Sequence, residues 1–214
     1  MADDLGAPGR PHGKRRGRPP HSDGPSARER ILHAGRELFN ELGYQRASLT
    51  QIAERAGVTR PAVNHYFRTK EDLYEALFES ARDGVVASGL KTAAEAETLT
   101  ARLQAFLEAA TQVDAGDRSY ARFIAASLLD AFRHPELADR AHSQLDDVRG
   151  FIEATLREAV EGGQVRADID VAAVTEMLLA VMWGMGLYAG FVGTHEQLES
   201  VVTQFGLLLE GRMW

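Results

Sequence analysis

Three segments in the first third of the chain begin with Ser or Thr and carry an acid or amide three residues later. The pairs are Ser26 with Glu29, Ser48 with Gln51, and Thr69 with Asp72. In such a pair each side chain bonds the other residue's backbone N–H at the start of a helix. Thr59, followed by Pro61, caps one more short helix. Apolar residues follow at helical spacing, and Gly43 and Gly57 mark helix ends.

The rest of the chain carries the same signals. Apolar stripes predict helices near residues 99–113, 123–132, 135–162, 170–193 and 194–209. We see no strand pattern. The sequence therefore predicts an all-α fold of about nine helices. We expect a basic arm that is disordered when free over residues 1–25, a three-helix helix-turn-helix DNA-binding domain over 26–70, and a helical ligand-binding and dimerisation domain over 71–214.

The charge is divided along the chain. The formal net charge is −7, yet residues 1–70 carry 13 Lys and Arg against 7 Asp and Glu. A basic front and an acidic remainder indicate that only the front meets phosphate. The chain has no cysteine, which excludes disulfides and thiolate metal sites. Its start is polar and basic with no apolar segment, so we do not expect a signal peptide.

The run from Ser48 to Phe67 contains two short helices that meet across Gly57. Glycine there can adopt the left-handed conformation that a tight turn needs. Ile52, Val58 and Val63 would close a small shared core. The second helix then presents an outward face suited to a major groove, consisting of Arg60, Ala62, Asn64 and His65. An asparagine on such a face can pair with adenine N6 and N7.

Residues 26–78 resemble the TetR family of bacterial transcriptional repressors. The matching segments are Leu38-Phe39, Gly43-Tyr44, the run from Ile52 to Thr59, and the run from His65 to Leu73. Where the family usually has Leu-Tyr, this chain has Val63-Asn64, so we do not transfer a half-site preference from relatives.

The resemblance implies roles for individual residues. Those expected at base edges or the nearby backbone are Arg60, Pro61, Ala62, Asn64 and His65. Those expected at phosphates are Ser48, Thr50, Tyr66 and Lys70. Thr59 is a candidate for contact with a base, and the alternative is that it only caps the helix. Arg55 lies within the matching run, and the alternative for it is a solvated charge on the helix surface.

The arm contains Arg16-Gly17-Arg18-Pro19, which matches the core of an AT-hook. Extended arginines can lie in a narrow A·T minor groove, which has an enhanced negative potential. Arg16 and Arg18 are therefore candidate DNA contacts. The alternative is a solubilising tail with loose phosphate attraction.

Apolar residues at 3,4 spacing between 171 and 192 predict a helix–helix seam, and the last helix has a similar stripe. By resemblance these two helices form a homodimer interface. The predicted contacts are Val174, Leu178, Val181, Met185, Tyr188, Val202, Phe205 and Leu209. Residues 177–193 carry no charge, and Gly186 with Gly190 matches a membrane dimerisation motif. That stretch is at the short limit of the length that a helix needs to span a bilayer, and no basic residues flank it. We therefore expect that the protein does not insert into a membrane.

By resemblance, the later helices enclose a pocket for a small hydrophobic or amphipathic effector. The candidate lining residues are Phe106, Tyr120, Phe123, Phe151, Met177, Met182 and Trp183. The alternative for each of them is a place in the hydrophobic core without ligand contact. Gln104, His134, His142 and Thr175 could add polar contacts. No catalytic, cofactor or metal motif is visible.

We therefore expect a cytoplasmic, homodimeric, non-enzymatic repressor. It would bind a palindromic double-stranded DNA operator and leave it when an effector binds. The alternative is a sequence-tolerant architectural DNA-binding protein that uses the arm.

Overall fold

The computed structural model describes residues 25–113 and 118–213, and all regular structure within them is helical. The α-helices are α1 Ala27–Arg46, α2 Leu49–Arg55, α3 Arg60–Tyr66, α4 Lys70–Ala81, α5 Ala87–Ala93, α6 Leu99–Val113, α7 Ser119–Arg133, α8 Ala138–Glu161, α9 Val171–Phe191 and α10 His195–Leu209. The predicted all-α class is confirmed.

Two short irregular helices join neighbouring elements. The π-helix η1, Arg82–Val86, links α4 and α5 without a break, so residues 70–93 form one helical path. The 3-10 turn η2, Pro135–Leu137, leads directly into α8. With α4 and α5 taken as one path, the described residues contain nine helical rods, the expected number.

The predicted helix starts are present. Ser26, Ser48, Thr69 and Thr194 each form a capping box with the residue three positions later. Each box satisfies two backbone N–H groups that a helix start would otherwise leave unbonded. Gly43 and Gly57 have positive φ values of 75° and 65°. The left-handed conformation expected at the turn glycine is therefore present.

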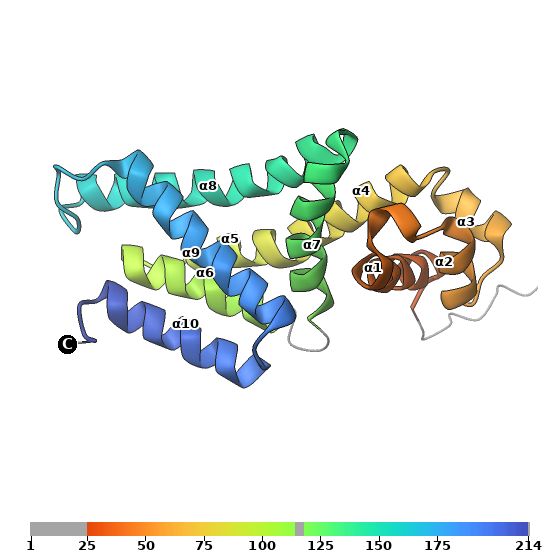
Figure 1. Cartoon of the computed structure of the whole chain (residues 1–214). Helices are drawn as coiled ribbons and strands as arrows, with labels where there is room; N and C mark the ends of the chain where they lie inside the picture. Colours follow the sequence, from red (N-terminus) through yellow and green to blue (C-terminus); the bar gives the residue numbers. More distant parts are fainter. Residues whose placement is uncertain (1–24, 114–117, 214) are drawn as a thin grey trace, which may run out of the picture.

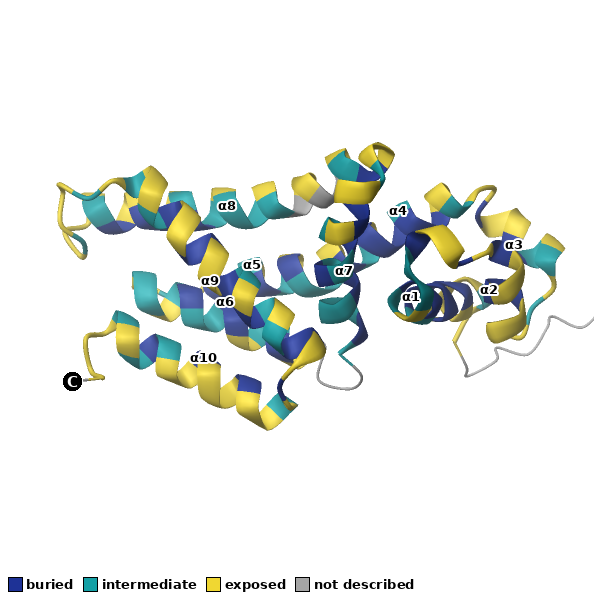
Figure 2. Ribbon diagram, in the orientation of Figure 1, coloured by how far each residue is buried: buried dark blue, intermediate teal, exposed yellow. Residues whose placement is uncertain are grey.

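Figure 1 shows α1, α2 and α3 gathered at one end of the molecule, with α6, α8, α9 and α10 at the other. Helix α7 stands between the two groups, and α4 leads from the first group toward the second. Figure 2 shows dark, buried residues where these helices face one another and exposed residues along α9 and α10.

A cluster of aromatic rings ties the first group of helices to α7. Phe39, Tyr44, Tyr74, Phe78 and Phe123 form a chain of ring contacts with centroid separations of 4.9 to 6.0 Å. Such pairs add about 0.5–1.5 kcal/mol each beyond the area they bury. The core around α1 to α4 therefore includes residues of α7.

A second core lies among η1 and α5 to α10. Its fully buried members include Leu103, Ile152 and Leu156. Gly190 of α9 packs directly on the backbone of α7, because a Cβ there would lie 3.0 Å from the N atom of Arg122. The small residue thus allows α9 to cross α7 at close range.

Candidate DNA-binding site and ligand cavity

The helix-turn-helix is formed by α2 and α3. Ile52 and Val63 are fully buried between them, and Ala53 is 3% exposed. The N–H of Val58 donates to the Ala53 carbonyl at 3.0 Å across the turn at Gly57. These residues belong to the larger core that α1 and α4 also form, so α2 and α3 are held against each other and against the helices behind them.

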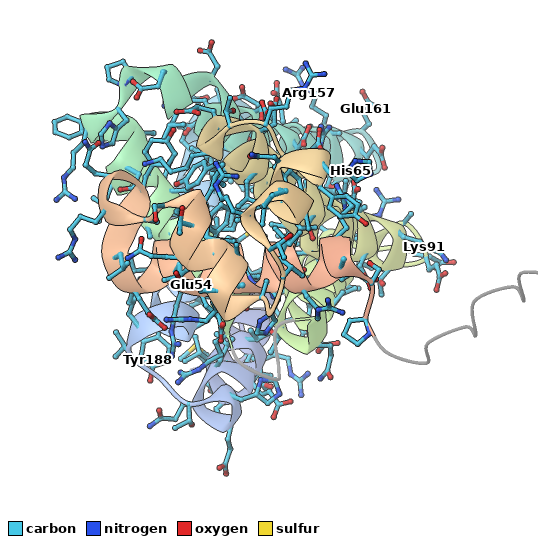
Figure 3. The ribbon with its side chains drawn as sticks, turned by 90° about the vertical axis from the view of Figure 1, so that its right-hand side faces the viewer. Glu54, His65, Lys91, Arg157, Glu161 and Tyr188 are labelled. Atoms are coloured by element: carbon cyan, nitrogen blue, oxygen red, sulfur yellow. The ribbon has the colours of Figure 1, made fainter. Side chains whose placement is uncertain are left out.

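The outer side of α3 is available to a large partner. Asn64 and His65 are exposed, Tyr66 is 44% exposed, and Arg60 is partly exposed. Figure 3, which looks at this end of the molecule, shows His65 of α3 and Glu54 of α2 near the viewer. Pro61 and Thr59 are also exposed and Ala62 is partly buried.

Thr59 has a structural task at the start of α3. Its Oγ1 accepts a hydrogen bond from the Ala62 N–H at 3.3 Å, so the side chain acts as the helix cap. Ser48 is engaged in the same way, since its Oγ bonds the Gln51 side chain at 2.8 Å and accepts from the Gln51 N–H. Thr50 is exposed on the first turn of α2.

Lys70 lies at the start of α4 and bonds within the protein. Its Nζ donates to the Tyr44 carbonyl at 2.7 Å and to the Gln45 carbonyl at 3.3 Å, and lies 4.3 Å from the centre of the Tyr44 ring. Partial burial lowers the pKa of its ammonium. A phosphate contact by Lys70 would compete with these bonds.

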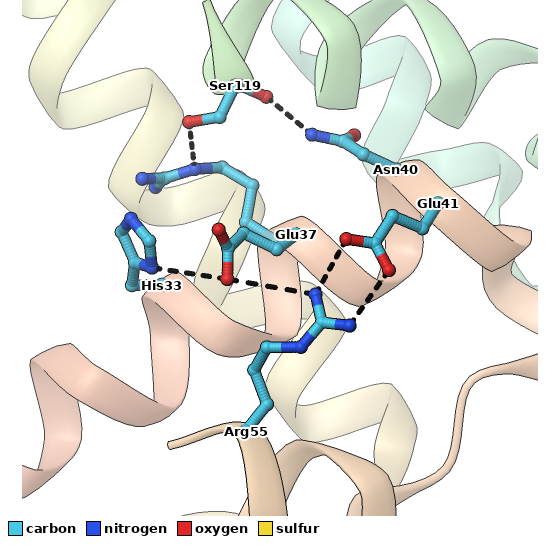
Figure 4. Close-up of polar contacts among 7 residues, drawn as sticks. His33, Glu37, Asn40, Glu41, Arg55 and Ser119 are labelled. Atoms are coloured by element: carbon cyan, nitrogen blue, oxygen red, sulfur yellow. Dashed lines mark hydrogen bonds and ion pairs between the residues drawn. The ribbon is translucent and has the colours of Figure 1, made fainter. Parts of the chain in front are cut away.

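Arg55 forms an ion-pair group between α2 and α1, as Figure 4 shows. Its two terminal nitrogens bond Glu41 at 2.7 and 2.9 Å, and Glu37 lies 3.9 Å away. The hydrogen bond from Arg55 lowers the pKa of Glu41. Arg55 therefore braces α2 against α1 rather than extending freely into solvent. Arg16 and Arg18 lie outside the described residues.

A cavity of about 160 Å³ lies among η1, α6, α7, α8, α9 and α10. Four of the predicted residues line it, namely Phe106, Tyr120, Met182 and Trp183. Most of the wall is apolar, and the polar side chains on it are Thr111, Arg118, Tyr120, Trp183 and His195.

Three predicted lining residues lie elsewhere. Phe123 is 1% exposed in the aromatic cluster with Tyr74 and Phe78. Phe151 stacks on Phe106 at 5.1 Å, behind the cavity wall. Met177 is 56% exposed on the outside of α9. None of the predicted polar candidates, Gln104, His134, His142 and Thr175, lines the cavity.

Sequence reasoning missed the polar wall residues Arg118 and His195. Arg118 has a left-handed φ of 55°, and its Nη1 donates to the carbonyls of Ala189 and Gly193 at the end of α9. His195 is the first residue of α10 and lies 3.2 Å from Glu199. Both residues stand at helix starts, where apolar periodicity carries no signal.

A buried arginine connects α1 to the cavity wall. Arg36 is 7% exposed, and its Nε donates to Ser119 Oγ at 2.7 Å. The guanidinium carbon lies 3.7 Å from the centre of the Tyr120 ring. The Tyr120 hydroxyl is 3.1 Å from Ser80 Oγ of α4. One signal was visible in the sequence, because Arg36 falls in phase with Leu32 on the apolar stripe of α1.

Asn40 strengthens the same junction. Its Nδ2 donates to the Ser119 carbonyl at 3.0 Å, one helical turn beyond Arg36, and Figure 4 shows this bond beside the Arg55 group. Two neighbouring side chains of α1 therefore hold the first residue of α7. A wall residue of the cavity, Tyr120, follows directly.

The predicted α9–α10 seam does not form one exposed stripe. Leu178, Met185 and Val202 are at most 6% exposed because they pack in the second core, so they are unavailable to a partner. Val174, Tyr188, Phe205 and Leu209 are partly buried, and Val181 is exposed. The exposed large apolar residues on these two helices are Met177, Val181, Leu187, Phe191, Val201 and Leu208, which we call the α9–α10 face.

Two family models match the chain. Residues 31–77 match the model for bacterial regulatory proteins of the tetR family, and residues 100–205 match the model for the C-terminal part of BetI-type transcriptional repressors. The chain belongs to the TetR family of transcriptional regulators. The resemblance seen in residues 26–78 is thereby confirmed and extended to the region beyond.

Relatives of this TetR-family regulator share part of its sequence. It is 23% identical to the HTH-type transcriptional regulator UidR of Escherichia coli K12 over 158 residues, covering 74% of this chain and 79% of UidR. It is 23% identical to the fatty acid metabolism regulator protein of Bacillus subtilis over 152 residues, covering 71% and 77%. Over 52 residues it is 44% identical to BetI of Yersinia pestis, covering 24% and 26%.

Solved structures share the fold of this TetR-family regulator. FadR of Bacillus subtilis, solved in complex with stearoyl-CoA, has a TM-score of 0.72 at 21% identity, covering 86% of this chain and 98% of FadR. The regulator PfmR of Thermus thermophilus has a TM-score of 0.69 at 25% identity, covering 86% and 99%. The helix-turn-helix and the helical C-terminal region therefore follow the family arrangement.

Proposed function

We propose that this protein is a ligand-responsive transcriptional repressor that acts in the cytoplasm and has no enzymatic activity. As a homodimer it would bind a palindromic operator and leave it when a small effector enters the cavity. One observation carries this proposal. The cavity wall residue Tyr120 contacts the buried Arg36 of α1, so the cavity and the DNA-binding end are in direct contact.

The α9–α10 face supports the homodimer. By length and composition α9 is the one helix in the described residues that could cross a membrane, although core helices of soluble proteins pass the same test. Its inner side packs in the second core, while Met177, Val181 and Phe191 remain exposed. Nothing lies within 4 Å of the Cβ position of Gly184 on the exposed side. A second copy would cover this apolar face and bring two recognition helices to successive major grooves.

The cavity chemistry supports an apolar or amphipathic effector. Burial of a hydrocarbon against apolar walls is favourable by a free energy of about 25 cal/mol per Å² of apolar surface. Arg118 and His195 can donate hydrogen bonds to a polar end group of the ligand. FadR of Bacillus subtilis was solved with stearoyl-CoA, which makes long-chain acyl compounds a reasonable first group to test.

Release would follow from a shift between two arrangements of the helices. The cavity touches α7 through Tyr120 and the α4–α5 path through Val85 and Val86. Both elements hold the DNA-binding end, through Arg36 and through the shared aromatic cluster. A ligand can favour the released arrangement only as far as it binds that arrangement more tightly.

The base-facing residues proposed for DNA are Arg60, Pro61, Ala62, Asn64 and His65. Ser48, Thr50, Tyr66 and Lys70 would contact phosphate, Lys70 after giving up its bonds to α1. We also propose that Arg16 and Arg18 of the arm enter the minor groove beside the operator.

Duplex selection tests the function. The full chain would be incubated with random double-stranded DNA, and the enriched duplex would then be footprinted and titrated with stearoyl-CoA or stearate. A single protected palindrome supports the proposal, and loss of protection on adding either compound identifies the effector class. Diffuse protection of all duplexes would instead favour an architectural DNA-binding protein.

A further inference from the structure

The first residue of α3 is bonded to a residue one turn further along its exposed face. Arg60 Nη1 donates a hydrogen bond to Asn64 Oδ1. Thr59 caps the helix and Pro61 fixes the backbone of its first turn, so Arg60 leaves the helix at a defined position. The two side chains thus form one unit on the outer side of the recognition helix.

The bond determines which groups of Asn64 remain free. An amide has one acceptor oxygen and one NH2 group with two donors. Arginine can only donate, so the oxygen of Asn64 must face Arg60. The unit therefore presents Asn64 Nδ2 and the remaining guanidinium N–H groups outward. No residue of α3 carries a carboxylate that could restore an acceptor.

A surface dominated by donors discriminates between the purines. In the major groove guanine offers two acceptors, O6 and N7, whereas adenine offers the N7 acceptor beside the N6 donor. An asparagine that reads adenine must accept from N6 through Oδ1. Here one lone pair of that oxygen accepts from Arg60, and a guanidinium held beside it would place N–H donors close to the N6 donor.

We propose that Arg60 and Asn64 act together as a guanine-reading unit in each half-site, which rests on the proposed function as an operator-binding protein. The sequence alone points to adenine at Asn64, and the bond to Arg60 reverses that expectation. Asn64 is thereby a specificity-determining residue that orients Arg60 and adds its own NH2 group as a donor.

Selection from random duplexes with the full-length protein tests the inference. Wild type should enrich a guanine at one position of each half-site. Replacing that guanine by 7-deazaguanine, which lacks the N7 acceptor but keeps O6, should weaken binding by about 5-fold, the lower end of the range for a complete bidentate contact. Asn64→Ala and Arg60→Ala should each lose most of the preference for guanine over adenine at that position.

Two further variants separate base reading from general loss of binding. Asn64→Asp keeps an acceptor for Arg60 but replaces the Nδ2 donors, so its preference for guanine should fall while the arginine stays in place. Lys91→Ala removes an exposed cation on α5, far from α3, and should leave both affinity and base preference unchanged.

The outcomes are distinct. Enrichment of adenine at a position whose preference depends on Asn64 would overturn the guanine-reading unit and leave the proposed function intact. Enriched operators in which Asn64→Ala changes no base preference would overturn it as well. No enrichment of any duplex would contradict operator binding itself, and this inference with it.

Discussion

Asp130 of α7 accepts a hydrogen bond from the backbone N–H of Tyr44 in α1 at 3.2 Å, and both residues are buried. The same carboxylate oxygen accepts from the Tyr74 hydroxyl of α4 at 3.3 Å. Burial raises the pKa of Tyr74, so its phenol stays protonated and keeps its donor. One carboxylate therefore joins three helices, namely α1 of the DNA-binding end, α4, and α7, which contributes to the wall of the cavity.

Replacing this carboxylate should lower stability. Asp130→Ala would leave two buried donors without a partner, at a cost of about 1–3 kcal/mol each. Urea unfolding followed by circular dichroism measures the loss. Asp130→Asn retains one acceptor oxygen and should be milder. Equal stability of the alanine variant and wild type would show that water replaces the carboxylate.

Glu71 should contribute to stability against acid. The hydrogen bond from the Tyr44 hydroxyl at 2.7 Å is the main cause that lowers its pKa below the usual 4.5. The stabilisation is therefore complete above the unfolded-state pKa and is lost as pH falls through the lower, folded-state value.

Tyr44→Phe tests this contribution. Removing the hydroxyl should reduce the fall in Tm of the protein between pH 6 and pH 3.5. Glu71→Gln should reduce it similarly, because it removes the titrating group. An unchanged pH dependence in both variants would mean that other carboxylates govern acid unfolding.

The space beside Gly89 controls the shape of the cavity. A Cβ at this position would lie 2.7 Å from Cδ2 of Phe106, which lines the cavity. Gly89→Ala should push the Phe106 ring and weaken binding of an apolar dye such as anilinonaphthalene sulfonate by about tenfold, which equals about 1.4 kcal/mol. Gly150→Ala, with nothing within 4 Å, should leave dye binding unchanged. Equal dye binding by the Gly89 variant would show that the ring moves away from the cavity.

A charge on the α9–α10 face should break the proposed dimer. Val181→Asp would place a carboxylate in an apolar contact, where an unpaired charge is costly. Sedimentation velocity should then show a monomer, and affinity for a palindromic duplex should drop. Phe132→Asp is the matched control, because Phe132 is 89% exposed on α7, outside this face. A dimer that survives the Val181 substitution would place the interface elsewhere.

Deletion of residues 1–20 measures the contribution of the arm. Removal of Arg16 and Arg18 should lower operator affinity. It should also flatten the dependence of log K on log salt by about 0.9 for each phosphate that the arm no longer neutralises. Fluorescence anisotropy over a salt series gives both quantities. If affinity and slope both stay the same, the arm takes no part in binding.

The local features of the fold were predictable from the sequence. The capping boxes at Ser48 and Thr69 and the turn at Gly57 depend on residues only a few positions apart, so their signal lies within a short window. The outward face of α3 followed from the same signals, because burial of Val63 determines which residues face away.

The cavity and the outer face of α9 were only partly predictable. Helix α9 is apolar on every side, so periodicity alone could not separate Leu178, which is buried, from Met177, which is exposed. Only the positions of α7 and α8 decide which side faces inward. Arg36 and Tyr120 meet across 84 positions of sequence, a distance over which no residue pattern carries information.

The π-turn at Arg82–Val86 gives the α4–α5 path one residue more than an unbroken α-helix would need for its length. Val85 and Val86 of this turn line the cavity, while Lys70 at the far end of the same path bonds the end of α1. Such single π-turns inside α-helices are rare and occur frequently at functional sites. If the proposed function holds, a ligand that displaces these valines would act on the same helical path that Lys70 bonds to α1, and α3 directly precedes that path in the chain.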